Sequence, residues 1–96
     1  MDTSALPGGD LIAQGLRDLA DGVESAPALL VLIGAPRLRR IGVRIPDSPV
    51  SRTSDVPPEH RLYSLLAAID SDAAHSRYNA LIRALVSFER AAECVS

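Results

Sequence analysis

Lysine and tryptophan are absent from this chain of 96 residues, and its only aromatic side chains are two tyrosines and one phenylalanine. The hydrophobic core must therefore be aliphatic, and Ala and Leu, which are plentiful here, favour helices. Strand formers such as Thr and Tyr are scarce, so the composition favours an all-α fold. Because every cation is an arginine, each positive charge is a planar group suited to carboxylates and phosphates.

The chain also lacks a cysteine pair, a signal peptide and a long apolar run. Its single cysteine, Cys94, cannot form an internal disulfide, so nothing indicates secretion. The N-terminus is acidic and turn-rich, without the basic and apolar regions of a signal peptide. The longest apolar run, Ala26 to Ile33, is far shorter than the roughly 20 residues that span a bilayer. We therefore expect a soluble, cytoplasmic protein with no membrane contact.

The hydrophobic periodicity predicts a small helical bundle that forms a single domain over residues 1–96, with four main helices and one short Arg-rich helix. The predicted main helices are Asp10–Val23, Ala26–Ile33, a helix from Pro57-Pro58 to Ile69, and Asp72–Cys94. The short helix is expected at Pro36–Ile41, between Gly34 and Gly42 as stop residues. Ala26–Ile33 is apolar all round, so we expect it at the centre of the core.

Two segments lie outside these predicted helices. Val43 to Ile45 alternates like a short strand, which would be an extended linker or would pair across a dimer. Residues 46–58 are rich in Pro, Ser and Asp and have no periodicity, which predicts a mobile loop.

Charge is segregated along the chain, although its formal net charge is only −2. Residues 1–35 carry five acidic residues against one arginine, residues 36–52 carry five arginines against one aspartate, and residues 53–96 carry six acidic residues against four arginines. The middle segment is thus the only strongly basic region. Its arginine cluster is the predicted partner-binding site and comprises Arg37, Arg39, Arg40 and Arg44.

Three interpretations of this cluster stay open. Arginines are common anchors of protein interfaces, so the first is a protein partner. The second is internal ion pairing with the acidic first helix. The third is nucleic acid, because ALLVLIGAPRLRRIG resembles a helix-turn-helix in outline, with Arg37, Arg39 and Arg40 on the second helix. The acidic net charge and the lack of polar base readers on that helix weigh against DNA.

Candidate catalytic and metal-binding groups are sparse. Asp72, His75 and Asn79 would share one helix face, but no further histidine or cysteine supports a metal site there, and a solvated helix start explains them as well. A nuclease would need His60 and Arg61 to converge with His75 on a phosphate. Gly34 with Arg37 at the start of the short helix could hold an anion. We predict no catalytic residue, no metal site and no cofactor.

The long last helix carries a candidate self-association face, which would give a homodimer. The residues of this face are Tyr78, Leu81, Leu85 and Phe88. The predicted function is a non-enzymatic protein-interaction module, or a small antitoxin-like regulatory subunit, that binds a partner protein through its arginines. A helix-turn-helix DNA-binding protein is the alternative.

Overall fold

A computed structural model describes residues 5–51 and 55–95, and it confirms that this part of the chain is an all-α domain. The elements are α1 (Gly9–Ala20), α2 (Ala26–Arg40), the 3-10 turn η2 (Pro49–Ser51), α3 (Pro58–Ile69) and α4 (Ala74–Val95). The described residues measure 37 × 27 × 18 Å along their principal axes. At about 1.5 Å per residue, the 22-residue α4 runs for most of the longest dimension.

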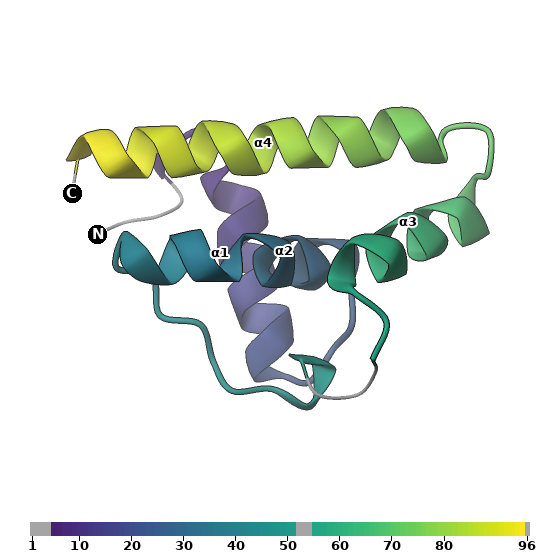
Figure 1. Cartoon of the computed structure of the whole chain (residues 1–96), viewed down its shortest axis with the longest axis horizontal. Helices are drawn as coiled ribbons and strands as arrows, with labels where there is room; N and C mark the ends of the chain where they lie inside the picture. The colour runs from purple at the N-terminus through teal and green to yellow at the C-terminus, as the bar shows by residue number, and fades with distance from the viewer. Residues whose placement is uncertain (1–4, 52–54, 96) are drawn as a thin grey trace.

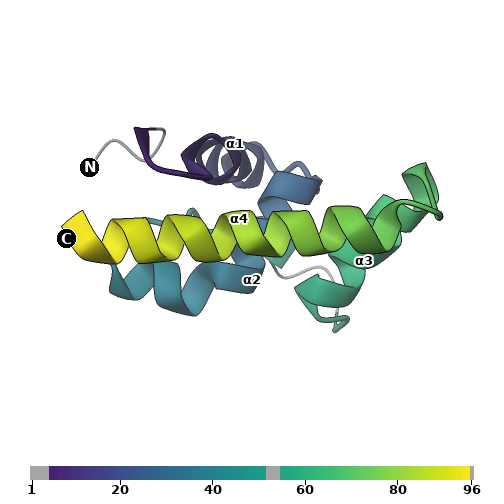
Figure 2. The same cartoon turned by 90° about the horizontal axis from the view of Figure 1, so that it is seen from above.

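The helices are arranged around α2, which packs against α1, α3 and α4. Figure 1 shows α4 running along the molecule above α2, with α1 crossing them steeply and α3 folding back towards α4. Seen from above in Figure 2, the C-terminal parts of α2 and α4 lie at the same end of the molecule, and the α3–α4 connection lies at the other. This arrangement brings the basic end of α2 next to the acidic end of α4.

The core confirms the central position expected for the apolar block. Ala28, Leu29, Leu30 and Val31 are fully buried at the start of α2. Ser25 is the predicted cap of this helix, and its hydroxyl accepts a hydrogen bond from the Ala28 N–H at 3.2 Å. No helix in the described residues is long and apolar enough to cross a membrane.

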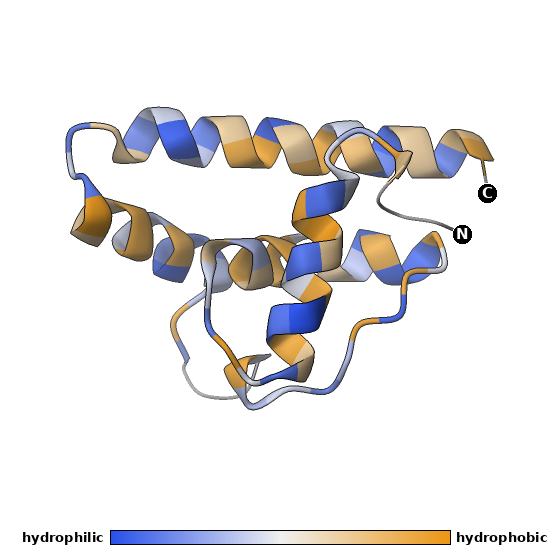
Figure 3. Cartoon of the chain, turned by 180° about the vertical axis from the view of Figure 1, so that it is seen from behind, coloured by the Kyte–Doolittle hydropathy of each residue, from blue (hydrophilic) through white to orange (hydrophobic). Residues whose placement is uncertain are grey.

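The helix α1 is shorter than its periodicity predicts. Its N-terminal cap is Gly8 rather than Asp10, and it ends at Ala20 because Gly22 adopts a left-handed conformation with φ of 73°. Val23, expected on the buried stripe, therefore lies beyond the helix and is 49% exposed. Within the helix, Figure 3 shows hydrophobic and hydrophilic residues alternating, as expected for an element with one buried side.

The predicted break at Gly34 and the separate short helix are wrong, because α2 continues through both Gly34 and Pro36 to Arg40. Gly34 serves packing instead of a turn, since a Cβ there would lie only 2.7 Å from a methyl group of Leu85. Pro36 removes one helical hydrogen bond, the one to the Leu32 carbonyl. Pro36 itself is exposed.

The helix α2 ends at Arg40, and the predicted stop residue Gly42 follows it with a left-handed φ of 98°. The Val43 N–H donates to the Leu38 carbonyl at 2.9 Å, which closes the last turn of the helix. Of the two alternatives for Val43–Ile45, the extended linker is the one seen in the single chain, and pairing across a dimer stays a prediction. These residues form an extended connection without strand pairing in the described structure, and Val43 is buried against the core.

The connection between α2 and α3 contributes to the core. Ser48 and Val50 are buried, and the Ser48 hydroxyl accepts a hydrogen bond from the Val50 N–H at 3.3 Å. Residues 52–54 of the predicted mobile loop lie outside the described residues. At the next connection, the Asp70 carboxylate accepts from the N–H groups of Asp72 and Ala73, which confirms the predicted break before α4.

Candidate functional site

Arg37 joins the two helix ends that meet at one end of the molecule. Its Nε donates to Glu93 Oε1 at 2.7 Å, and its Nη1 lies 3.5 Å from Glu89 Oε1. The hydrogen bond that Arg37 donates to Glu93 raises the pKa of Arg37, and the same bond lowers the pKa of Glu93. Arg37 thus pairs with α4, so the interpretation of internal pairing with the acidic first helix is wrong for this residue, and 35% of its side chain is exposed. Its role in partner binding stays a prediction.

Glu89 is a buried carboxyl group, 5% exposed, in the middle of this pairing. Burial raises its pKa, while the charge of Arg37 and, more weakly, that of Arg40 lower it. The sequence carries a signal for this position that our interpretation missed. Glu89 follows Leu85 by four residues, so the two share one face of α4, and an acidic residue on a buried face needs a partner.

The other three arginines of the cluster form what we call the arginine surface: Arg39, Arg40 and Arg44. All three side chains are exposed, and within residues 5–51 and 55–95 none of them forms an ion pair. Arg39 and Arg40 are the last two residues of α2, and Arg44 follows the turn that closes this helix. Their backbone is therefore held in place by the core, while their charges face solvent.

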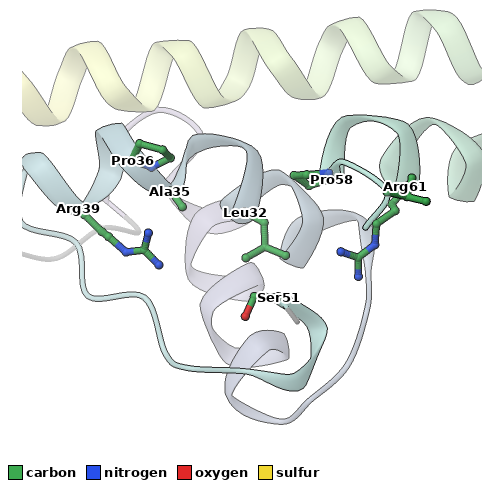
Figure 4. Close-up of a pocket in the computed structure, with 8 residues that line it drawn as sticks. Leu32, Ala35, Pro36, Arg39, Ser51, Pro58 and Arg61 are labelled. Atoms are coloured by element: carbon green, nitrogen blue, oxygen red, sulfur yellow. The ribbon is translucent and has the colours of Figure 1, made fainter. Parts of the chain in front are cut away.

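Beside Arg39 lies a pocket of about 290 Å³, which we call the α2–α3 pocket. One side is a single face of α2, formed by Leu32, Ala35, Pro36 and Arg39 at helical spacing. Figure 4 shows Arg39 and Arg61 at opposite ends of the pocket, with Leu32 between them. The pocket thus combines an aliphatic wall with guanidinium groups at both ends.

Arg61, on α3, is held more firmly than the arginines of the cluster. It forms an ion pair with Glu24, and its Nη2 donates to the Val50 carbonyl at 2.8 Å. Only 10% of its side chain is exposed. From the sequence, Arg61 is only a residue of the first turn of α3. Its two partners lie 11 and 37 residues away along the chain, so no short-range sequence pattern predicts these contacts.

The described structure does not bring together the candidate catalytic residues. His60 lies at the start of α3 and His75 at the start of α4, so the length of α3, about 18 Å, separates them. Arg61 is engaged by Glu24, as described above. Asn79 lies 3.2 Å from the His75 ring nitrogen on an exposed surface, and no group of three His, Cys, Asp or Glu side chains in the described residues could hold a metal ion.

The helix-turn-helix interpretation of residues 28–42 is wrong, because the chain forms a continuous helix where the turn would have to be, at Gly34. The same continuity removes the anion site expected at the start of a short helix there. No helix begins at Pro36, and Arg37 is paired with acids.

The predicted self-association face is divided between core and surface. Phe88 is fully buried and Leu85 is 4% exposed, so both pack inside the chain. Tyr78 and Leu81 are half-buried, and the Tyr78 ring lies 5.8 Å from the ring of Tyr63 on α3. A homodimer through Tyr78 and Leu81 stays a prediction, because Leu85 and Phe88 are not on the surface.

Comparison with protein-family models, with curated proteins and with solved structures finds no match for this chain, so its function is argued from its own residues.

Proposed function

We propose that this chain is a non-enzymatic protein-interaction module, or a small regulatory subunit, that binds an acidic face of a partner protein through Arg39, Arg40 and Arg44. The observation that carries the proposal is that these three exposed arginines lie within six residues of one another along the chain and have no ion pair in the described residues. In an acidic chain whose other charges are spread along its helices, such a cluster is a place where a partner with complementary charge gains affinity. We place this activity in the cytoplasm.

The rigidity of the site supports a protein partner. Arg39 and Arg40 project from a helix whose other side is fully buried, so binding does not require the backbone to be ordered. Guanidinium groups form paired hydrogen bonds with carboxylates, which makes an acidic protein surface a suitable complement. Duplex DNA is a weaker candidate, because the chain has an acidic net charge and the helix that carries Arg39 and Arg40 has no Asn, Gln or Ser to read bases beside them.

The test compares two variants with the same change in charge. The first is Arg39→Gln/Arg40→Gln/Arg44→Gln, and the control is Arg17→Gln/Arg77→Gln/Arg83→Gln, which neutralises three exposed arginines elsewhere. Tagged chains are expressed in the source cells, and captured proteins are quantified by mass spectrometry. We expect one acidic partner to be captured by the wild type and the control, and its purified form to bind the first variant at least about tenfold more weakly in calorimetry.

Equal capture by the first variant and the control would contradict the proposal. Binding to random duplex DNA, measured at two salt concentrations, provides the second readout. Tight binding that weakens steeply with salt and disappears in Arg39→Gln/Arg40→Gln would assign the arginines to nucleic acid instead.

A further inference from the structure

The α2–α3 pocket places an apolar wall beside an arginine, which the arginine surface alone does not do. Leu32, Ala35 and Pro36 provide an aliphatic wall, and Pro58 at the start of α3 faces it. Pro36 and Arg39 are exposed, whereas Ala35 is only 6% exposed, so the pocket has an apolar base and a rim in contact with solvent. A ligand that fits it must therefore carry both an apolar part and a polar part.

The charges of the pocket favour a single anionic group at the Arg39 end. Arg61, at the other end, already has its charge balanced by the Glu24 carboxylate. Arg39 has no acidic partner among the described residues. Among the described lining residues, one net positive charge next to an apolar wall suits a monoanion, and a carboxylate accepts two parallel hydrogen bonds from a guanidinium group.

The volume of the pocket limits the size of the ligand. At about 290 Å³ it lies at the lower end of the range for small-molecule sites, which is roughly 300–1,000 Å³. One acidic side chain with an aliphatic neighbour is of suitable size.

Ser51 distinguishes a peptide from a simple carboxylic acid. Its hydroxyl lines the pocket and donates its proton to the Ser48 carbonyl at 2.7 Å. The hydroxyl proton is thus committed, and the Oγ lone pairs are left to accept a hydrogen bond. A peptide backbone has N–H groups to offer, whereas a simple carboxylate has none.

We propose that the α2–α3 pocket binds a peptide segment in which a Glu or Asp side chain lies next to an aliphatic residue. The acidic group pairs with Arg39, the aliphatic residue packs on Leu32 and Ala35, and a backbone N–H donates to Ser51. This inference deepens the proposed function, because it says which kind of residue of the partner protein contacts the chain. It rests on the proposed function only in taking the partner protein as the source of the peptide.

The test uses defined probes with the intact chain and follows backbone and arginine side-chain signals by nuclear magnetic resonance. The probes are N-acetyl-leucyl-glutamyl-leucinamide, its glutamine counterpart and 4-methylpentanoate. We expect the glutamyl peptide to shift the signals of Leu32, Ala35 and Arg39 with a Kd on the order of 1 mM, as suits a short ligand. The glutamine peptide and the free acid should each bind about tenfold more weakly.

Two variants make the test specific. Arg39→Gln should weaken binding of the glutamyl peptide about tenfold, and Arg77→Gln, which changes an exposed arginine outside both the pocket and the arginine surface, should leave it unchanged. Absence of shifts with the glutamyl peptide, or equal binding to Arg39→Gln and wild type, would overturn the proposal. Equal affinity for 4-methylpentanoate would overturn the assignment to a peptide.

These outcomes are separable from the test of the proposed function. The probe titration needs no partner protein, so loss of peptide binding with normal partner capture would overturn the pocket assignment alone. Peptide binding with equal capture by the two triple variants would overturn the proposed function alone.

Discussion

At the scale of single residues, the Glu89 carboxyl group is the most unusual feature of the chain. It is almost fully buried, and its one cationic contact, Arg37, is at 3.5 Å and is shared with Glu93. The cost of burying the charge exceeds what this pairing returns, so the pKa of Glu89 is raised above its ordinary value of 4.5. The exposed Glu93, which holds the short hydrogen bond from Arg37, has a lowered pKa.

The opposite pKa shifts of these two carboxyl groups predict opposite pH effects on stability. A raised pKa in the folded chain means that the contribution of Glu89 is fully present below about pH 4.5 and is lost as the pH rises through the folded-state pKa. Glu89→Gln cannot ionise and avoids this loss. We expect its free energy of unfolding, relative to wild type, to increase between about pH 4 and pH 8 in urea titrations.

Glu93→Gln is the matched control, because its pKa shift has the opposite sign. The contribution of Glu93 is present above its ordinary pKa of 4.5 and is lost as the pH falls through the lowered folded-state pKa. This variant should be less stable than wild type at neutral pH, and the difference should close under acidic conditions. Stability curves for wild type and Glu89→Gln that stay parallel across the whole pH range would contradict the argument.

At the scale of elements, two glycines allow helices to cross closely. A Cβ at Gly15 on α1 would lie 2.3 Å from the Pro27 carbonyl oxygen of α2, a backbone atom that cannot move independently. A Cβ at Gly34 on α2 would instead lie 2.7 Å from a methyl group of Leu85, the end of a flexible side chain. The two glycines lie inside helices and do not have positive φ, so their main difference is what they touch.

This difference predicts a clear order of stability for two variants. An alanine in place of glycine gains about 1 kcal/mol of helix propensity at either position. At Gly15 we expect the clash with the backbone to outweigh this gain, so that Gly15→Ala loses about 1–3 kcal/mol. Gly34→Ala should change stability by less than about 1 kcal/mol, because Leu85 can adopt another rotamer.

Thermal unfolding followed by circular dichroism measures both variants. In a domain of this size, 1 kcal/mol corresponds to a shift in Tm of about 4–8 °C. Gly34→Ala with a larger loss than Gly15→Ala would mean that the α2–α4 contact, and not the α1–α2 contact, is the tighter crossing.

The packing of α2 also explains why its boundaries were predicted wrongly. Gly34 and Pro36 are both typical helix-ending residues, and sequence reasoning weighs them by their local cost of a few kcal/mol at most. The helix continues because its preceding turns, Ala28 to Val31, are fully buried, and stopping at Gly34 would remove Leu38 from the same core. Tertiary burial outweighs local preference here.

At the scale of the whole molecule, the candidate dimer face and the core compete for the same side chains. Phe88 is fully buried within a single chain, where it packs in the same core cluster as Ile12 of α1 and Leu30 of α2. A residue that fills the core of one copy cannot also fill the interface with another. The remaining candidates, Tyr78 and Leu81, provide a smaller surface.

We therefore expect Phe88→Ala to act on folding and not on assembly. It should lose about 3–5 kcal/mol, a large part of the stability of a small domain, and its effect should not depend on protein concentration. Urea unfolding of wild type and variant at two concentrations tenfold apart measures this. A wild-type midpoint that rises with concentration would show that folding is coupled to self-association.

The sequence by itself determined the helical class, the caps at Ser25 and Gly42 and the central place of the apolar block, because composition, capping chemistry and hydrophobic periodicity act over a few residues. Only the tertiary structure decided which arginines are free. Arg37 meets Glu89 and Glu93, more than 50 residues away along the chain, because α2 and α4 end at the same side of the molecule. Such pairings depend on how helices pack, and no local pattern encodes them.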